Sequence, residues 1–239
     1  MPPGTPERTL WLVASAIGMP TALVVARSYG RRRAVRYLAG YTAAAAVQYA
    51  FLSAMRRRIG PEPSSPADLL TTGRGLCGAV LAGLVVTDIR DRTGPAGWLG
   101  LVAIVWGATA SDWLDGPLAR RFGVTRLGAA LDIEADSWLT LWAATGAVRW
   151  GGLPPWSLLP PLLRYIHPSL DLLVGGMPTG GGPWWGRATG TAQMALFVAA
   201  LVPRRARPRD GALTRVAVLV AAGQATTVFL LLRRRGLRS

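Results

Sequence analysis

Long apolar windows recur along the whole chain and decide which class of fold it can adopt. Each window runs for about 18 to 22 residues, the length that an α-helix needs to cross a hydrocarbon core of roughly 30 Å. The windows lie at residues 10–27, 35–54, 68–88, 95–113, 131–149, 153–176, 184–202 and 212–232. Strand-like alternation is absent, and a backbone exposed to lipid must satisfy its hydrogen bonds within helices. We therefore predict an all-α integral membrane protein with up to eight membrane segments.

Charged residues are few and of one dominant sign. They make up 16% of the 239 residues, and the net charge is +15. Arginine carries all of the positive charge and clusters between the apolar windows, where it faces anionic headgroups. This placement favours membrane lipids over nucleic acid as the partner of the basic residues. The single cysteine, Cys77, excludes an intramolecular disulfide and a cysteine-based zinc site.

A segment rich in proline and serine divides the chain. Residues 58–67 contain Pro61, Pro63 and Pro66, so we expect an extended connector there. On this basis residues 1–57 form an N-terminal pair of hydrophobic helices, and residues 68–239 form a six-helix membrane domain. Most carboxylates lie in the second part, so we expect the chemistry there.

Four aspartates lie close together in residues 111–138: Asp112, Asp115, Asp132 and Asp136. An ionised carboxylate costs several kcal/mol to desolvate unless a partner compensates its charge. At 100° per residue the first two share one helix face, and the last two are spaced i, i+4 on another. Two helices would therefore direct two carboxylates each into a shared cleft. Such a cleft suits Mg²⁺ or Mn²⁺ better than zinc, and a metal with open positions would bind phosphate.

The residues around the aspartates fit the same chemistry. Gly116 and Ala119 leave room beside the first pair, while Arg120 and Arg121 offer positive charge to a diphosphate. A solvated loop in which the aspartates merely pair with these arginines and Arg126 explains the charge balance but not the spacing. Carboxylates at a membrane boundary that face a bundle interior usually have a function.

The complete pattern reads Asp112-x2-Asp115-Gly116-x2-Ala119-Arg120, followed by Gly128-x3-Asp132-x3-Asp136. It closely resembles the signature of the CDP-alcohol phosphatidyltransferases, membrane enzymes of phospholipid synthesis. All eight fixed positions match. Seven residues separate Arg120 from Gly128, where the family most often has eight.

Two further stretches resemble this family, and the similarity covers about residues 67–232. LLTTGRGL at 69–76 is similar to the first core helix, whose Leu-Thr-x2-Arg element would place Thr71 and Arg74 near the nucleotide. GRATGTAQM at 186–194 is similar to the entry to the fifth core helix. Arg187 and Gln193 match that entry, whereas the positions of Thr189 and Gly190 do not.

The resemblance implies a six-helix core, usually dimeric, preceded here by two additional helices. It implies an active site open to the cytoplasmic face of a bacterial inner or plasma membrane, with two divalent ions, Mg²⁺ or Mn²⁺. Four aspartates would bind the metals: Asp112, Asp115, Asp132 and Asp136, the last also acting as general base. The implied nucleotide-binding residues are Thr71, Arg74, Asp112, Gly116, Ala119, Arg120 and Gly128.

The reaction implied by the resemblance transfers a phosphatidyl group from a CDP-activated lipid, such as CDP-diacylglycerol, to a small hydroxylated acceptor and releases CMP. Arg164, His167 and Asp171 are spaced to share one helix face, which could receive the phosphate of an acceptor. Arg187 is a second candidate for acceptor binding. A structural pair between Arg164 and Asp171, with a packed His167, explains the same spacing. The sequence does not identify the acceptor.

Three alternatives remain open at this stage. The donor could be a CDP-linked headgroup and the acceptor diacylglycerol. The chain could be an intramembrane prenyl-diphosphate transferase, although the acidic motifs of such enzymes are typically much farther apart in sequence. It could also be a catalytically silent membrane scaffold of the same fold.

Overall fold

The computed structural model describes residues 6–60, 65–89, 95–123, 125–150, 152–164, 184–201 and 211–236. It gives the helical backbone without the side chains for residues 6–11, 14, 15, 95, 96, 98, 112–120, 184–187 and 227–236. The described residues are helical throughout their regular structure and include no strand, which confirms the all-α prediction. The elements are α1 (Pro6–Tyr29), α2 (Arg31–Ile59), α3 (Pro66–Thr87), α4 (Pro95–Phe122), α5 (Arg126–Arg149), the 3-10 helix η2 (Pro155–Leu158), α7 (Trp184–Leu201) and α8 (Gly211–Gly236). Residues 159–164 continue from η2 as a further helical segment.

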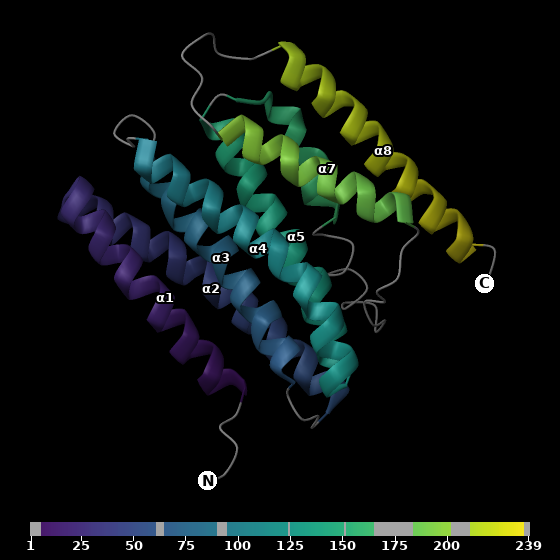
Figure 1. Cartoon of the computed structure of the whole chain (residues 1–239), viewed down its shortest axis with the longest axis horizontal. Helices are drawn as coiled ribbons and strands as arrows, with labels where there is room; N and C mark the ends of the chain where they lie inside the picture. Colours follow the sequence, from purple (N-terminus) through teal and green to yellow (C-terminus); the bar gives the residue numbers. More distant parts are fainter. Residues whose placement is uncertain are drawn as a thin grey trace.

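Helix α3 is the centre of the bundle. It packs against α1, α2, α4 and α5, whereas α7 contacts α5 on one side and α8 on the other. Figure 1 shows the consequence: α1 and α2 lie along one flank, α7 and α8 lie along the opposite flank, and α3 to α5 lie between them. Inward-facing side chains of α3 are therefore covered by α1, α2, α4 and α5, and those of α5 by α2, α3 and α7.

Close approach between α2 and α3 depends on glycine. A β-carbon on Gly40 would lie 3.2 Å from the Cα of Gly83, and one on Gly83 would lie 2.7 Å from the ring of Tyr37. Small residues at helix contacts let two backbones approach closely, which is the usual packing device of membrane helices. The N-terminal helix pair is thus packed directly against the central helix.

The helices that carry the aspartates extend beyond their apolar windows. Helix α4 continues to Phe122 and α5 begins at Arg126, so only residues 123–125 separate the two helices. Gly123, at φ +96°, makes the turn after α4 in a conformation that other residues rarely adopt. Thr125 then caps α5, because its side-chain oxygen accepts the Gly128 backbone N–H at 2.8 Å.

Helix α3 also begins earlier than its window, at Pro66 inside the segment predicted to be a connector. A capping box explains the early start. The Ser65 side chain accepts the Asp68 backbone N–H at 3.2 Å, and the Asp68 carboxylate accepts the Ser65 backbone N–H at 2.8 Å. Proline is well tolerated at the first helical position because its missing N–H is not needed there.

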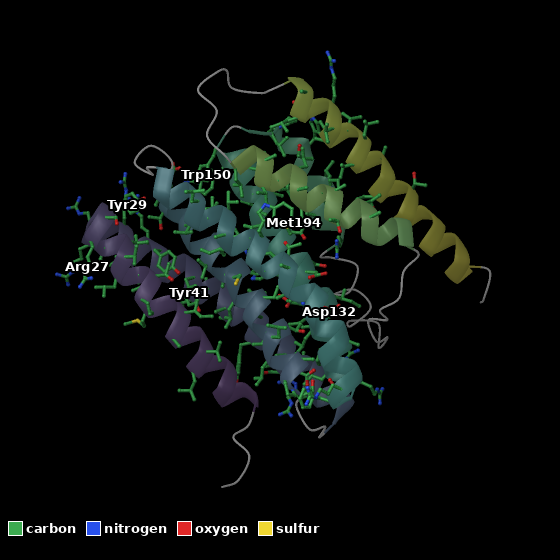
Figure 2. The ribbon with its side chains drawn as sticks, viewed as in Figure 1. Arg27, Tyr29, Tyr41, Asp132, Trp150 and Met194 are labelled. Atoms are coloured by element: carbon green, nitrogen blue, oxygen red, sulfur yellow. The ribbon has the colours of Figure 1, made fainter. Side chains whose placement is uncertain are left out.

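Among the described residues, α3 is the helix that is long and apolar enough to cross a membrane by length and composition. Two thirds of its most apolar window, 67%, is buried inside the bundle. Arginines flank both ends of the bundle: Figure 2 labels Arg27 and Tyr29 at the end opposite to Asp132. Exposed apolar side chains such as Leu12, Leu99 and Leu219 lie on α1, α4 and α8.

Candidate active site at the start of α5

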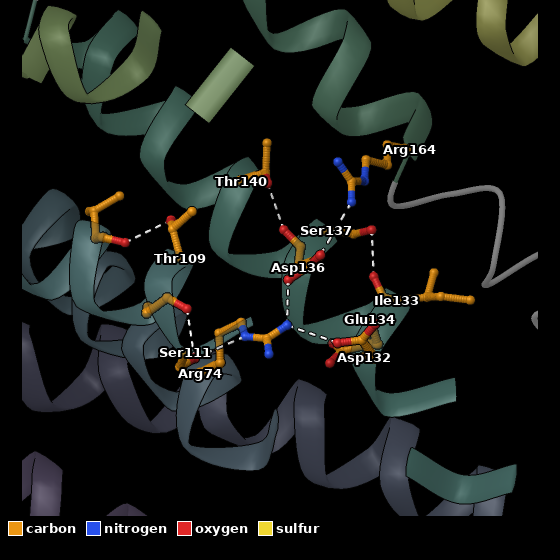
Figure 3. Close-up of polar contacts among 12 residues, drawn as sticks. Arg74, Thr109, Ser111, Asp132, Ile133, Glu134, Asp136, Ser137, Thr140 and Arg164 are labelled. Atoms are coloured by element: carbon orange, nitrogen blue, oxygen red, sulfur yellow. Dashed lines mark hydrogen bonds and ion pairs between the residues drawn. The ribbon is translucent and has the colours of Figure 1, made fainter. Parts of the chain in front are cut away.

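A buried arginine joins three helices at the candidate site. Arg74, on α3, has no exposed side-chain surface. Its Nη1 lies 2.8 Å from Asp132 Oδ1 and 2.7 Å from Asp136 Oδ1, both on α5 (Figure 3). Its Nε donates a hydrogen bond to Ser111 Oγ on α4 at 3.3 Å. The structure thus brings together three predicted site residues, Arg74, Asp132 and Asp136. Ser111, which was not predicted, is a fourth member of the cluster.

The charge of this cluster accounts for the burial of Arg74. An isolated guanidinium would be costly inside a helix bundle, and two neighbouring carboxylates would repel each other. One guanidinium nitrogen shared between both anions reduces both costs through short, charge-assisted hydrogen bonds. The carboxylates are not themselves enclosed, because the side chains of Asp132 and Asp136 are 43% and 30% exposed. They remain accessible to a ligand on the side that faces away from Arg74.

A second arginine approaches Asp136 from another element. Arg164 Nη2, at the end of the helical segment 159–164, lies 3.5 Å from Asp136 Oδ2. The same guanidinium rests over α7, because a β-carbon on Gly190 would lie 3.0 Å from Arg164 Nη1. The two oxygens of Asp136 therefore face different arginines, Oδ1 toward Arg74 and Oδ2 toward Arg164. The structure places Arg164 beside the aspartates, while His167 and Asp171 lie outside the described residues.

A hydrogen-bond network ties the first turn of α3 to the first turn of α5. Thr125 Oγ1 donates to Asp68 Oδ1 at 2.8 Å, while the other oxygen of Asp68 caps its own helix at Ser65. The N-terminal ends of both helices are thereby fixed side by side, about two turns before Asp132 along α5. Sequence reasoning missed Asp68 and Thr125. The available signals were the Ser-x2-Asp spacing at 65–68 and a threonine just before the Gly128 helix turn.

Gly128 lies inside this network. A β-carbon there would collide with Asp68 Oδ1 and lie 2.7 Å from Thr125 Oγ1. The absence of a side chain therefore permits the bond between Asp68 and Thr125. The resemblance implied a nucleotide role for Gly128, and the contacts seen in the structure are with these two side chains.

The described part of the donor set fits a hard divalent cation. Asp132 and Asp136 provide carboxylate oxygens from one face of α5, and both side chains are partly exposed. Among the described side chains no group of three or more His, Cys, Asp or Glu residues converges. The side chains of Asp112 and Asp115, which would complete the predicted set, are not among them.

The remaining predicted residues are placed by backbone or by burial. Thr71 is buried on α3, one turn before Arg74. The backbones of five others lie on the last turns of α4, and only the backbone is described: Asp112, Asp115, Gly116, Ala119 and Arg120. Arg187 lies in the first turn of α7, again as backbone. Gln193 is buried further along α7, and its Oε1 accepts no hydrogen bond from the described residues.

A sequence model of the CDP-alcohol phosphatidyltransferase family matches residues 65–229. The match begins at the cap of α3 and includes every residue of the candidate site, whereas α1 and α2 precede it. No curated protein and no solved structure matches the chain significantly. Because the match covers well over half of the sequence, the chain belongs to the CDP-alcohol phosphatidyltransferase family, whose members are integral to membranes and generally depend on divalent metals.

Proposed function

We propose that this chain transfers a phosphatidyl group, or another substituted phospho-alcohol group, from a CDP-alcohol such as CDP-diacylglycerol to a hydroxylated acceptor, with release of CMP. The observation that supports this most directly is the cluster of Arg74, Asp132 and Asp136 at the start of α5, within the family match. It combines two accessible carboxylates with a buried cation, which is suitable for a phosphorylated substrate and a metal. The proposed role is a step of phospholipid synthesis.

Four aspartates would hold two divalent ions, Mg²⁺ or Mn²⁺: Asp112, Asp115, Asp132 and Asp136. When bound, such ions neutralise the diphosphate and the charge that develops on the departing CMP. Counted with Arg74 and Arg164, these six residues carry four negative charges and two positive charges, a net charge of −2 before metal binds. The excess negative charge still attracts a divalent cation, although less strongly than the four aspartates would without the two arginines.

Asp136 is the proposed general base. Arg74 holds its Oδ1 at 2.7 Å, which leaves Oδ2 on the side facing Arg164. An acceptor hydroxyl next to Oδ2 would give up its proton as its oxygen attacks the phosphorus that bears the lipid. The new P–O bond forms as the bond to CMP breaks, and the proton leaves Asp136 for solvent after the product departs. Arg74 also keeps the carboxylate in a fixed orientation, because its Nη1 bonds Asp132 as well as Asp136.

Arg164 and Arg187 are proposed to receive an anionic group on the acceptor. The Arg164 guanidinium is about one third exposed, and it lies only 3.5 Å from Asp136. An acceptor phosphate bound there would bring a neighbouring hydroxyl within reach of the base, which is the positioning that this class of catalysis requires. Arg187 is proposed from the family resemblance alone.

The nucleotide is proposed to lie between α3 and α4, against Thr71, Arg74, Asp112, Gly116, Ala119, Arg120 and Gly128. For Gly128 this role would be indirect, because its packing against Asp68 sets the spacing of α3 and α5.

We further propose a multi-pass protein of a bacterial inner or plasma membrane, with the site facing the cytoplasm and with two copies forming a homodimer. Residues 68–239 would be the catalytic membrane domain, with 1–57 as an additional helix pair and 58–67 as the connector.

The test is a transfer assay on the purified chain with radiolabelled CDP-diacylglycerol and Mg²⁺ or Mn²⁺. Glycerol 3-phosphate, inositol 1-phosphate, serine and phosphatidylglycerol are supplied separately as acceptors. We expect CMP and a lipid product with one of them, and no reaction with excess EDTA. A second arm pairs CDP-linked headgroups with diacylglycerol, and a third supplies a polyprenyl diphosphate. Metal binding without turnover in any arm would refute the proposal and favour a silent scaffold.

A further inference from the structure

A second carboxylate on α5 faces away from the candidate site and into the bundle. Glu134 lies two residues from Asp132 and from Asp136, so at 100° per residue its side chain leaves α5 on roughly the opposite face. It is 3% exposed. Gln48 Nε2, on α2, donates a hydrogen bond to Glu134 Oε2 at 3.1 Å, and the other carboxyl oxygen has no hydrogen-bond partner among the described residues.

Helix α3 leaves space for this contact through a glycine, Gly75. A β-carbon on Gly75 of α3 would collide with the amide of Gln48. Gln48 is itself buried. Three helices therefore contribute to one polar contact: α2 supplies the donor, α5 supplies the acceptor, and α3 leaves the space between them.

Such a contact is a poor source of stability. A buried carboxyl with one unpaired oxygen carries a desolvation penalty that a single hydrogen bond only partly offsets. An apolar pair of similar size would pack at lower cost in this position. A hydrogen bond differs from an apolar contact in being directional, so it can fix how a helix is rotated about its own axis. The contact between Gln48 and Glu134 is therefore suited to fixing the rotation of α5.

The rotation of α5 matters because of what lies on its other face. Asp132 and Asp136 meet Arg74 at 2.8 Å and 2.7 Å, distances that a small rotation of the helix would lengthen. Glu134 belongs to the same helical turn as both aspartates, so it cannot move around the axis without them. Gln48 contacts that turn on the Glu134 face, while Arg74 contacts it on the opposite face, at Asp132 and Asp136.

We propose that Gln48 and Glu134 are positioning residues, and that their hydrogen bond fixes the rotation of α5 at which Asp132 and Asp136 bind metal. This inference rests on the proposed function. It assigns a task to α2, which lies outside the residues matched by the family model. The N-terminal helix pair is then part of the active-site framework, because one of its side chains orients the catalytic helix.

The test compares five variants of the full-length chain: Gln48→Leu, Glu134→Leu, the double variant, Glu134→Gln and Gln224→Leu. Mn²⁺ affinity is measured without substrate by electron paramagnetic resonance, and thermal unfolding is recorded in the same detergent. We expect Gln48→Leu and Glu134→Leu each to weaken Mn²⁺ binding about tenfold. The double variant should also lose about tenfold and not a hundredfold, because both changes remove the same contact.

Two controls separate orientation from charge and from general packing. Glu134→Gln cannot carry a charge but keeps a hydrogen-bond acceptor, so we expect Mn²⁺ affinity within about twofold of wild type. Gln224→Leu deletes another buried glutamine, whose Nε2 donates to Thr189 Oγ1 at 3.3 Å between α8 and α7. It should also leave Mn²⁺ affinity within about twofold of wild type.

The outcomes distinguish this inference from the proposed reaction. The inference is overturned if Glu134→Gln binds Mn²⁺ as weakly as Glu134→Leu, since charge would then be the cause. It is also overturned if both leucine variants bind like wild type. In an active enzyme the leucine variants should lower kcat with little change in KM for the CDP-lipid. A wild-type chain that binds Mn²⁺ but transfers nothing would refute the reaction while the affinity series still decides the role of Gln48 and Glu134.

Discussion

The contact between α3 and α5 uses different chemistry at its two ends. At the N-terminal end of α5, Arg74 joins Asp132 and Asp136, and Asp68 joins Thr125. Toward the C-terminal end the buried side chains are mostly apolar, including Ala143, Ala144 and Ala147 on α5 and Leu81, Ala82 and Val85 on α3. The ion pair described there, Arg149 with Asp88 at 3.7 Å, is about half exposed and contributes little.

The difference separates two tasks on one pair of helices. Close-packed apolar side chains stabilise the bundle by burying surface and by dispersion. Buried charges and hydrogen bonds cost desolvation, and they persist where binding or chemistry requires them. We therefore expect changes at the polar end to affect metal binding and turnover, and changes at the apolar end to affect stability alone.

The largest effect is expected for Asp136→Asn at the polar end. Turnover should fall by about 10²- to 10⁴-fold, because the amide cannot accept the acceptor proton. The amide oxygen can still accept a hydrogen bond from Arg74, so the fold and the binding of CDP-diacylglycerol should persist. CMP release and ligand-induced protection against thermal unfolding measure the two properties. Turnover near the wild-type rate would remove Asp136 from its proposed role.

Arg74→Met should cause the largest loss of stability. The loss of its two short hydrogen bonds to carboxylates should cost about 3 kcal/mol, since both carboxylates are partly exposed and remain solvated. Mn²⁺ should stabilise this variant more than it stabilises wild type, since a bound cation would replace the lost charge. Unfolding by denaturant in EDTA and in Mn²⁺ provides the comparison. Equal stability of the variant and wild type in EDTA would show that the buried pair is not important for the fold.

At the apolar end, Gly146→Val should destabilise the bundle by about 1–3 kcal/mol through overpacking. A β-carbon at this position would already lie 3.1 Å from Leu201 Cδ2 and 3.2 Å from Val85 Cγ2. Mn²⁺ affinity and kcat of the folded variant should stay within about twofold of wild type. A large loss of Mn²⁺ affinity would contradict the division between the two ends.

The smallest effect is expected for Gly128→Ala. The added methyl group displaces the Asp68 carboxylate and breaks its bond to Thr125, which should cost about 1 kcal/mol. Gly107→Ala is the matched control, because a β-carbon there meets no atom within 4 Å. It should be neutral or slightly stabilising. If Gly128 instead lines the cytidine pocket, its variant would raise KM for the CDP-lipid without lowering stability.

The sequence predicted the helical class because long apolar runs leave few other solutions in a membrane. It placed the helix ends less well at the site, since the windows count apolar residues, whereas α4 continues past Asp115 to Phe122 and α5 begins before its window, at Arg126. The capping box at Ser65 was overlooked because neighbouring prolines indicated a connector. The early starts of α3 and α5 share one cause: polar residues can extend a helix when its N-terminus is capped.

The partners within the site depend on tertiary packing that local patterns do not reveal. Arg74 and Asp136 are far apart in sequence and meet only because α3 and α5 pair in parallel register. The same is true of Gln48 and Glu134, which are separated by 86 residues. The spacing of the aspartates predicted a shared face on α5, but it did not predict that an arginine would already be bound to that face.

The buried guanidinium of Arg74 has a consequence for the order of events when this protein is made. Because it belongs to the chain, it compensates the aspartates of α5 as soon as the two helices meet, before any ion arrives. Insertion and assembly can then be completed in a compartment where free divalent cations are scarce. In the proposed enzyme, acquisition of metal becomes the last step of maturation, and it occurs through the exposed sides of Asp132 and Asp136.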